Sequence, residues 1–113
     1  MRPIRRRSRE RRAVIYTLDA GDDLDRIYAI IAEASSPTTA DRYDSRIRAF
    51  CERLEHGSER GTRRDDVRPD LRVVGFERRV TVAFVVEPER VVILRLFYGG
   101  ANWSDELAEG DTG

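Results

Sequence analysis

Residues 71–98, LRVVGFERRVTVAFVVEPERVVILRLFY, decide the fold of this 113-residue chain. Two segments within this stretch, 80–86 and 91–98, are almost continuously apolar, as is typical of central strands covered by a helix on one face. Residues 71–76 form a shorter segment of the same kind. The polar, proline-containing residues 87–90 suit a turn. The stretch therefore predicts three consecutive strands.

Two amphipathic helices are predicted upstream of these strands. Acidic residues within 19–23 suit the first turn of the first helix, where the helix dipole favours negative charge. Ser36 is placed to cap the second helix, Pro37 to occupy its first position, and Gly57 to end it. Each helix carries one apolar stripe: Leu24, Ile27, Tyr28 and Ile31 in the first, and Ala40, Tyr43, Ile47, Phe50 and Leu54 in the second. Their short connection predicts an antiparallel helical hairpin.

A further strand is predicted at residues 13–18, which are β-branched and aromatic, whereas the polar residues 58–70 read as a loop. The first strand is separated from the other three by both helices, so it must pair with them at long range. The predicted order is β-α-α-β-β-β. The predicted fold class is α+β, with the helical hairpin packed on an antiparallel four-stranded sheet.

The chain length fits a single domain. We expect that domain at residues 13–107, preceded by a basic, flexible arm at 1–12 and followed by an acidic, disordered tail at 108–113. The arm holds seven of the 21 arginines and one acid. We interpret it as solvated, with contact to DNA or RNA, a lineage extension or a misplaced start codon as alternatives.

Composition excludes several classes of function. No apolar run is long enough to span a membrane, and no apolar stretch follows the basic N-terminus as it would in a secretory signal. The single Cys51 cannot form an internal disulfide, and with His56 as the only histidine there is no zinc-binding cluster. A formal net charge of zero argues against coating nucleic acid by charge alone. We expect a cytoplasmic protein without metal or cofactor, with Cys51 in the core and His56 near the end of the second helix.

Four stretches resemble the RelE/ParE toxins of type II toxin–antitoxin systems, and the ParE branch in particular. Residues 17–27, TLDAGDDLDRI, are similar to the opening pattern T-x-x-A-x-x-D-L-x-x-I of that superfamily. Ala40-Asp41-Arg42-Tyr43 followed by Ile47, Cys51 and Leu54 is similar to its second-helix pattern. Gly61 followed by residues 68–72, RPDLR, resembles the entry into its second strand, and residues 92–100, VILRLFYGG, resemble its last strand. The resemblance covers residues 13 to 107.

The resemblance implies one of two activities. ParE-type toxins bind DNA gyrase and trap the cleaved DNA complex, so the function would be a protein–protein contact rather than catalysis. RelE-type toxins cleave messenger RNA on the ribosome, which needs a base, cations for the phosphate and an acid. A base is missing here, because the chain has no lysine and arginine hardly ever gives up its proton. We therefore favour the gyrase inhibitor over the endoribonuclease, with a non-toxic family member as a third possibility.

A small set of residues could carry either activity. If the protein is a ribonuclease, Arg72 and Arg95 could hold a phosphate, provided that their side chains share a face, and Tyr98 could move a proton. If it is a binding protein, the candidate target- or partner-binding residues are Arg72, Arg95, Tyr98, Trp103, Tyr28 and Ile31. Structural roles compete with these: Arg95 could be paired with a carboxylate, and Tyr98 and Trp103 could be packing residues.

Both activities imply a partner. A toxin that harms its own cell must be masked, and the family implies a cognate antitoxin in a hetero-oligomeric complex. Disordered antitoxin segments lay apolar side chains into a groove or add a strand to an open sheet edge. The candidate surfaces are therefore the helices with apolar stripes and the exposed edge of the sheet.

Overall fold

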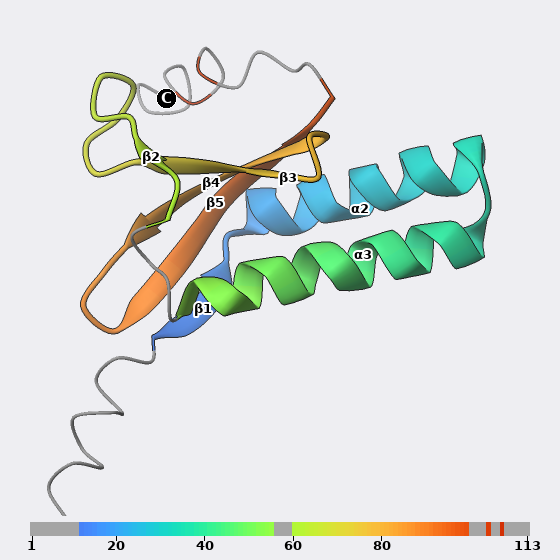
Figure 1. Ribbon diagram of the computed structural model, residues 1–113, viewed down its shortest axis with the longest axis horizontal. Coiled ribbons are helices and arrows are strands. Elements are labelled where there is room, and N and C mark those ends of the chain that lie inside the picture. Colours follow the sequence, from blue (N-terminus) through green and yellow to red (C-terminus); the bar gives the residue numbers. More distant parts are fainter. Residues whose placement is uncertain (1–11, 56–59, 100–103, 105–106, 108–113) are drawn as a thin grey trace, which may run out of the picture.

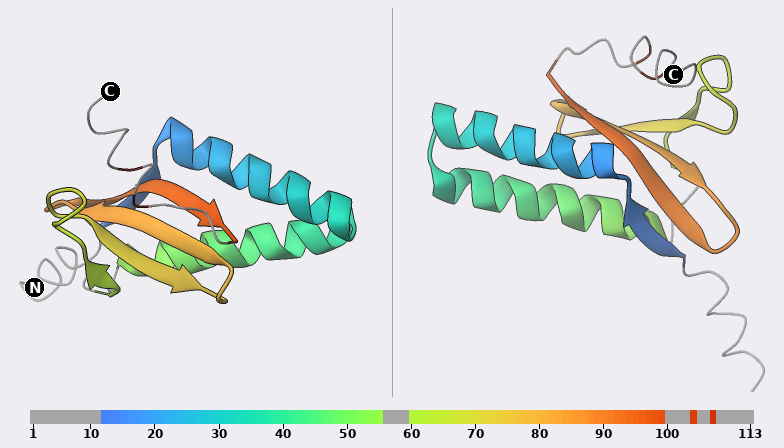
Figure 2. Two further views of the ribbon diagram at one scale, coloured as in Figure 1. Left: turned by 90° about the horizontal axis from the view of Figure 1, so that it is seen from above. Right: turned by 180° about the vertical axis from the view of Figure 1, so that it is seen from behind.

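The computed structural model describes residues 12–55, 60–99, 104 and 107. Within them, two long helices lie side by side on one face of a twisted sheet (Figures 1 and 2). The elements are β1 (Ala13–Tyr16), α2 (Leu18–Ala34), α3 (Pro37–Glu52), a 3₁₀ turn (Arg53–Glu55), β2 (Thr62–Arg63), β3 (Arg72–Phe76), β4 (Val80–Val86) and β5 (Arg90–Tyr98). The predicted α+β class and the helical hairpin on a sheet are confirmed.

Local capping fixes where the helices begin. The Ser36 side chain accepts a hydrogen bond from the Thr39 N–H at 3.1 Å, and Pro37 follows at the first helical position, as predicted. The first helix begins at Leu18, slightly earlier than the acidic run suggested, because the Thr17 side chain caps it by accepting from the Ala20 N–H at 3.0 Å. The predicted roles of His56 and Gly57 lie outside the described residues.

The sheet differs from the prediction in two respects. Its order is β1-β5-β4-β3-β2, so it has five strands, and the additional β2 comes from residues predicted as loop. β1 lies at an edge, but it pairs with β5 in parallel, from Ala13 opposite Arg90 to Tyr16 opposite Ile93. The reason is the helical hairpin, which returns the chain to the end of the sheet where β1 began. β3 therefore runs in the same direction as β1, and the two reversals from β3 to β4 and from β4 to β5 give β5 that direction again.

The sheet carries a hydrophobic cluster on each face. The larger cluster lies under the helices and includes the buried Leu24, Ile47, Cys51, Phe84 and Ile93. The smaller cluster lies on the opposite face, where Leu71, Ala83, Phe97 and Leu107 are buried and Val67, Val73 and Leu94 pack against them. The expectation that Cys51 is a core residue is confirmed. Burial raises the pKa of its thiol to about 11, so Cys51 is a packing group rather than a nucleophile.

The structure explains why a glycine stands at position 61 of the family-like pattern. Gly61 has φ +80°, and a Cβ at this position would lie 2.3 Å from the carbonyl oxygen of Val73. This close approach lets the short β2 pair with β3, with Thr62 opposite Val73 and Arg63 opposite Arg72. Glycine is needed here for both conformation and space.

Among the described residues, no helix is long and apolar enough to cross a membrane. The same part of the chain holds no group of three or more His, Cys, Asp or Glu side chains suited to a metal ion.

Candidate partner-binding groove

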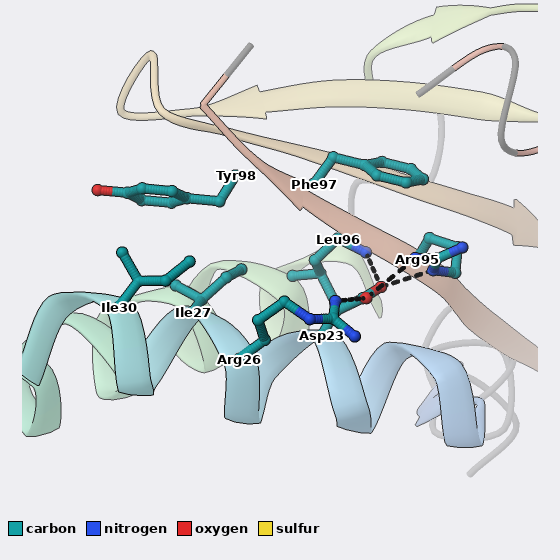
Figure 3. Close-up of a pocket in the computed structure, with 8 residues that line it drawn as sticks. All are labelled: Asp23, Arg26, Ile27, Ile30, Arg95, Leu96, Phe97 and Tyr98. Carbon is teal, nitrogen blue, oxygen red and sulfur yellow. Dashed lines mark hydrogen bonds and ion pairs between the residues drawn. The ribbon is translucent and has the colours of Figure 1, made fainter. Parts of the chain in front are cut away.

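One edge of β5 pairs with a strand along its first half and contacts a helix along its second half. β1 pairs only with the first residues of β5, up to Ile93. Beyond that point the start of α2 lies beside the strand (Figure 3). Thr17 makes the transition, because its N–H donates to the Ile93 carbonyl at 3.1 Å and its hydroxyl donates to the Leu94 carbonyl at 2.8 Å. From Leu94 onward, side chains take the place of a neighbouring strand.

Asp23 is the main side chain at this edge. It is only 1% exposed, and its carboxylate accepts the Leu96 N–H at 2.9 Å. Arg95 donates to it from Nε at 2.7 Å and from Nη2 at 3.1 Å, and Arg26 donates from Nη1 at 2.9 Å (Figure 3). A buried carboxylate is tolerated only when such donors replace its hydration. Asp23 therefore joins α2 to the sheet rather than merely favouring the helix dipole.

A bulge in β5 decides where the two candidate arginines point. Arg95 pairs with Ala83 and Ile93 with Phe84, so Leu94 is the extra residue. Ala83 belongs to the cluster on the helix-free face, and the Arg95 guanidinium lies 4.8 Å from the ring centre of Phe97 in that cluster. Arg95 thus starts on the helix-free face and reaches round the edge to Asp23.

Arg72 lies on the other face. It pairs with Phe84, whose side chain is in the cluster under the helices, and its Nη1 lies 3.5 Å from the Arg60 carbonyl. Arg72 and Arg95 therefore do not share a face, and the condition set for joint phosphate binding is not met. The structural alternative for Arg95, pairing with a carboxylate, is the one observed. This geometry does not favour the ribonuclease hypothesis.

A groove of about 370 Å³ opens between α2 and the last residues of β5. Its lining residues are Asp23, Arg26, Ile27, Ile30, Arg95, Leu96, Phe97 and Tyr98 (Figure 3). In Figure 3, Ile27 and Ile30 rise from the helix toward the strand, and the Tyr98 ring lies above them. The groove combines an apolar floor with charged groups at one end, which suits a peptide segment.

The groove also exposes an edge of the sheet. Backbone groups alternate in direction along an antiparallel strand. The Leu96 N–H is directed toward Asp23, and the Gly99 N–H is directed the opposite way, to the Arg79 carbonyl at 2.7 Å. The Leu96 carbonyl and the Tyr98 N–H therefore face the groove. They offer an acceptor and a donor to an added strand.

The structure gathers only some of the predicted binding residues here. Arg95 and Tyr98 line the groove, whereas Arg72 does not. The Tyr28 hydroxyl donates to Asp41 at 2.7 Å and so ties α2 to α3, and Ile31 packs against the main core. Trp103 lies outside the described residues.

Sequence reasoning missed six lining residues as binding groups, namely Asp23, Arg26, Ile27, Ile30, Leu96 and Phe97. One signal was available in the sequence. Ile30 is a large apolar residue of the first helix that falls outside the predicted stripe, and it is 40% exposed. An apolar side chain off the buried face is a better marker of a contact surface than one within that face.

Comparisons with known proteins agree with this architecture. Residues 14–103 match the family model described as ParE toxin of type II toxin-antitoxin system, parDE. The chain is 31% identical over 96 residues to Toxin ParE3 of Caulobacter vibrioides, covering 85% of this chain and 95% of that protein. It also resembles a solved chain of the chromosomal ParDE TA system from P. aeruginosa, with a TM-score of 0.69 and 24% identity over 80% of this chain and 98% of that one. The structural likeness concerns the fold.

Proposed function

Because the chain belongs to the ParE toxin family of type II toxin–antitoxin systems, we propose that it arrests bacterial growth in the cytoplasm by binding DNA gyrase. We further propose that a cognate antitoxin keeps it inactive by occupying the groove between α2 and β5. The observation that carries the second proposal is the open half of the β5 edge beside Ile27 and Ile30. No step of catalysis is required of any residue.

The chemistry of the groove specifies the antitoxin segment. An extended strand could pair with the Leu96 carbonyl and the Tyr98 N–H while its apolar side chains cover Ile30. Arg26, whose side chain is 62% exposed, stands at the charged end of the groove and suits an acidic residue of the partner. We therefore propose an extended segment with alternating apolar residues and an acidic residue at one end.

Toxicity is tested by inducing the chain alone and by adding the purified protein to a gyrase supercoiling assay. We expect growth arrest and loss of supercoiling. Growth arrest with unaffected gyrase would contradict the gyrase proposal, and mapping messenger RNA ends in the same cells would then test the ribonuclease alternative. An absence of growth arrest would contradict toxicity itself.

Antitoxin binding is tested with a matched pair of variants. Ile30→Glu places a charge in the groove, whereas Ile15→Glu places the same charge on β1 at a similarly exposed isoleucine, 37% against 40%. The protein is co-expressed with the product of the neighbouring small open reading frame, and the affinity of the purified pair is measured. We expect Ile30→Glu to weaken the complex by at least about tenfold, as loss of an apolar anchor does. Equal effects of the two substitutions would argue against the groove.

A further inference from the structure

The turn between β3 and β4 adopts a conformation that its residues disfavour. Residues 76–79 form this turn, closed by a hydrogen bond from the Arg79 N–H to the Phe76 carbonyl at 3.0 Å. Its two central residues, Glu77 and Arg78, have φ values of 51° and 61°. Turns with positive φ at both positions favour Asn-Gly, and side chains other than these are strained there. Backbone strain of this kind in non-glycine residues clusters at functional sites.

The helical hairpin contacts the turn through an ion pair and an aromatic cluster. Arg46 of α3 makes a bidentate ion pair with Glu77, from Nε at 2.9 Å and from Nη2 at 3.0 Å. The Arg46 guanidinium also lowers the pKa of the Glu77 carboxyl, which keeps the pair charged. Phe76, at the base of the turn, packs against Tyr43 and Phe50. The helical hairpin therefore contacts the turn both at Glu77 and at its base.

Arg78 is one of the exposed arginines for which the described residues provide no carboxylate partner. Arginines paired with carboxylates are Arg26, Arg46, Arg48, Arg63, Arg64, Arg90 and Arg95. Arg78 is exposed and has no hydrogen bond or ion pair with any described residue. Its guanidinium is thus available to an external group. Arg78 therefore combines a strained backbone with an available guanidinium.

The turn adjoins the groove through Tyr98. Arg79 approaches the Tyr98 hydroxyl, with 3.5 Å between Nη1 and the oxygen, and Tyr98 also lines the groove. The Tyr43 hydroxyl beneath them is buried and has no hydrogen-bond partner among the described residues. The surface formed by Arg78, Arg79 and Tyr98, here called the turn surface, therefore ends where the groove begins. Arginine and tyrosine are the residue types that dominate binding energy at interfaces.

We propose that the turn surface is the contact with the toxin's protein target, that Arg78 binds an acidic side chain there, and that the antitoxin masks it through Tyr98. This inference rests on the proposed toxin function. A carboxylate is the anionic group that a protein target offers, whereas affinity for a nucleic-acid backbone comes from many phosphate contacts and the turn surface presents two arginines, Arg78 and Arg79. Arginine also binds a carboxylate through two parallel hydrogen bonds.

The test is a substitution that should separate folding from activity. Arg78→Gly removes the guanidinium and relieves the positive-φ strain, so its melting temperature should rise while growth arrest weakens on the order of tenfold, as expected for loss of a charge-assisted pair. Antitoxin affinity should stay at the wild-type value, because Arg78 does not line the groove. Arg78→Lys should retain part of the activity. Arg53→Gln, at the far end of α3, is the control for loss of one exposed positive charge and should remain toxic.

Each other outcome overturns a specific claim. Unchanged growth arrest with Arg78→Gly would remove Arg78 from the target contact, whereas parallel loss of arrest and antitoxin binding would point to a structural role. Binding of the wild type to linear DNA that is abolished by Arg78→Gly would replace the protein partner with nucleic acid. Normal growth arrest by the wild type without gyrase inhibition would refute only the gyrase proposal, since the Arg78 comparison is scored on growth. An absence of arrest by the wild type would overturn both.

Discussion

The outer edge of β3 and the second half of the β5 edge find their hydrogen-bond partners in different ways. At β3, the short β2 supplies backbone partners, and the tight approach of Gly61 to Val73 leaves no space between them. At the second half of β5, Thr17 and Asp23 supply side-chain partners, and a groove remains beside the strand. A strand edge can therefore be satisfied without being closed. That difference separates an edge used for stability from an edge open to a partner.

The largest effect is expected when the side chain that covers the second half of the β5 edge is removed. Asp23→Ala leaves the Leu96 N–H without its acceptor and removes the carboxylate that pairs with Arg95. We expect a loss of about 3 kcal/mol in the free energy of unfolding, as for one partner of a buried ion pair. Urea denaturation measures it, with Asp23→Asn as the control, because the amide retains one oxygen and should cost less. A loss below that of Asp23→Asn would contradict the role of the carboxylate.

A substitution that disturbs the contact between β2 and β3 should reduce the stability of the protein less than Asp23→Ala does. Gly61→Ala places a Cβ against the Val73 carbonyl and forces alanine to positive φ. We expect a destabilisation of about 2 kcal/mol from strain and overpacking. Thermal unfolding measures it. Gly21→Ala is the control, because nothing lies within 4 Å of its added Cβ in α2, and it should be neutral or stabilising.

The smallest loss of stability is expected for a substitution of Thr17, which contacts β5 where β1 ends and α2 begins. Thr17→Val removes both the helix cap on the Ala20 N–H and the donor to the Leu94 carbonyl. We expect a loss of about 1 kcal/mol, typical of a cap residue. Thr17→Ser keeps the hydroxyl and should stay close to the wild type in the same urea titration. If the valine variant matched the serine variant, the hydroxyl would have no part in covering the edge.

The sequence predicted the elements of the fold more fully than the site. Apolar periodicity identified both helices and the strands after residue 70, because burial of one face requires that spacing. It also supplied the Ser36–Pro37 start of α3. The parallel pairing of β1 was missed, since local pattern says nothing about the direction in which a distant strand returns. Arg95 and Tyr98 were the predicted residues that reached the groove.

Arg72 shows why the remaining site residues were not predictable. Both Arg72 and Arg95 lie in strands, and their sequence positions do not reveal a common face. The bulge at Leu94 shifts the register of β5 by one residue, which places Arg95 on the face opposite Arg72. A single-residue shift moves every following side chain to the other face. Register therefore decided which arginine could meet Asp23.

The sequence by itself determined the α+β class, the order of the two long helices and the four longer strands, and the apolar residues of the core, because those depend on short-range periodicity and burial. It also carried the family resemblance that the comparisons bear out. Only the tertiary structure decided that Asp23 would cover the β5 edge, that Ile30 would border a groove, and that Arg78 would stand alone on a strained turn. Those features depend on contacts between residues far apart in the chain, where the direction and register of strands set which side chains meet.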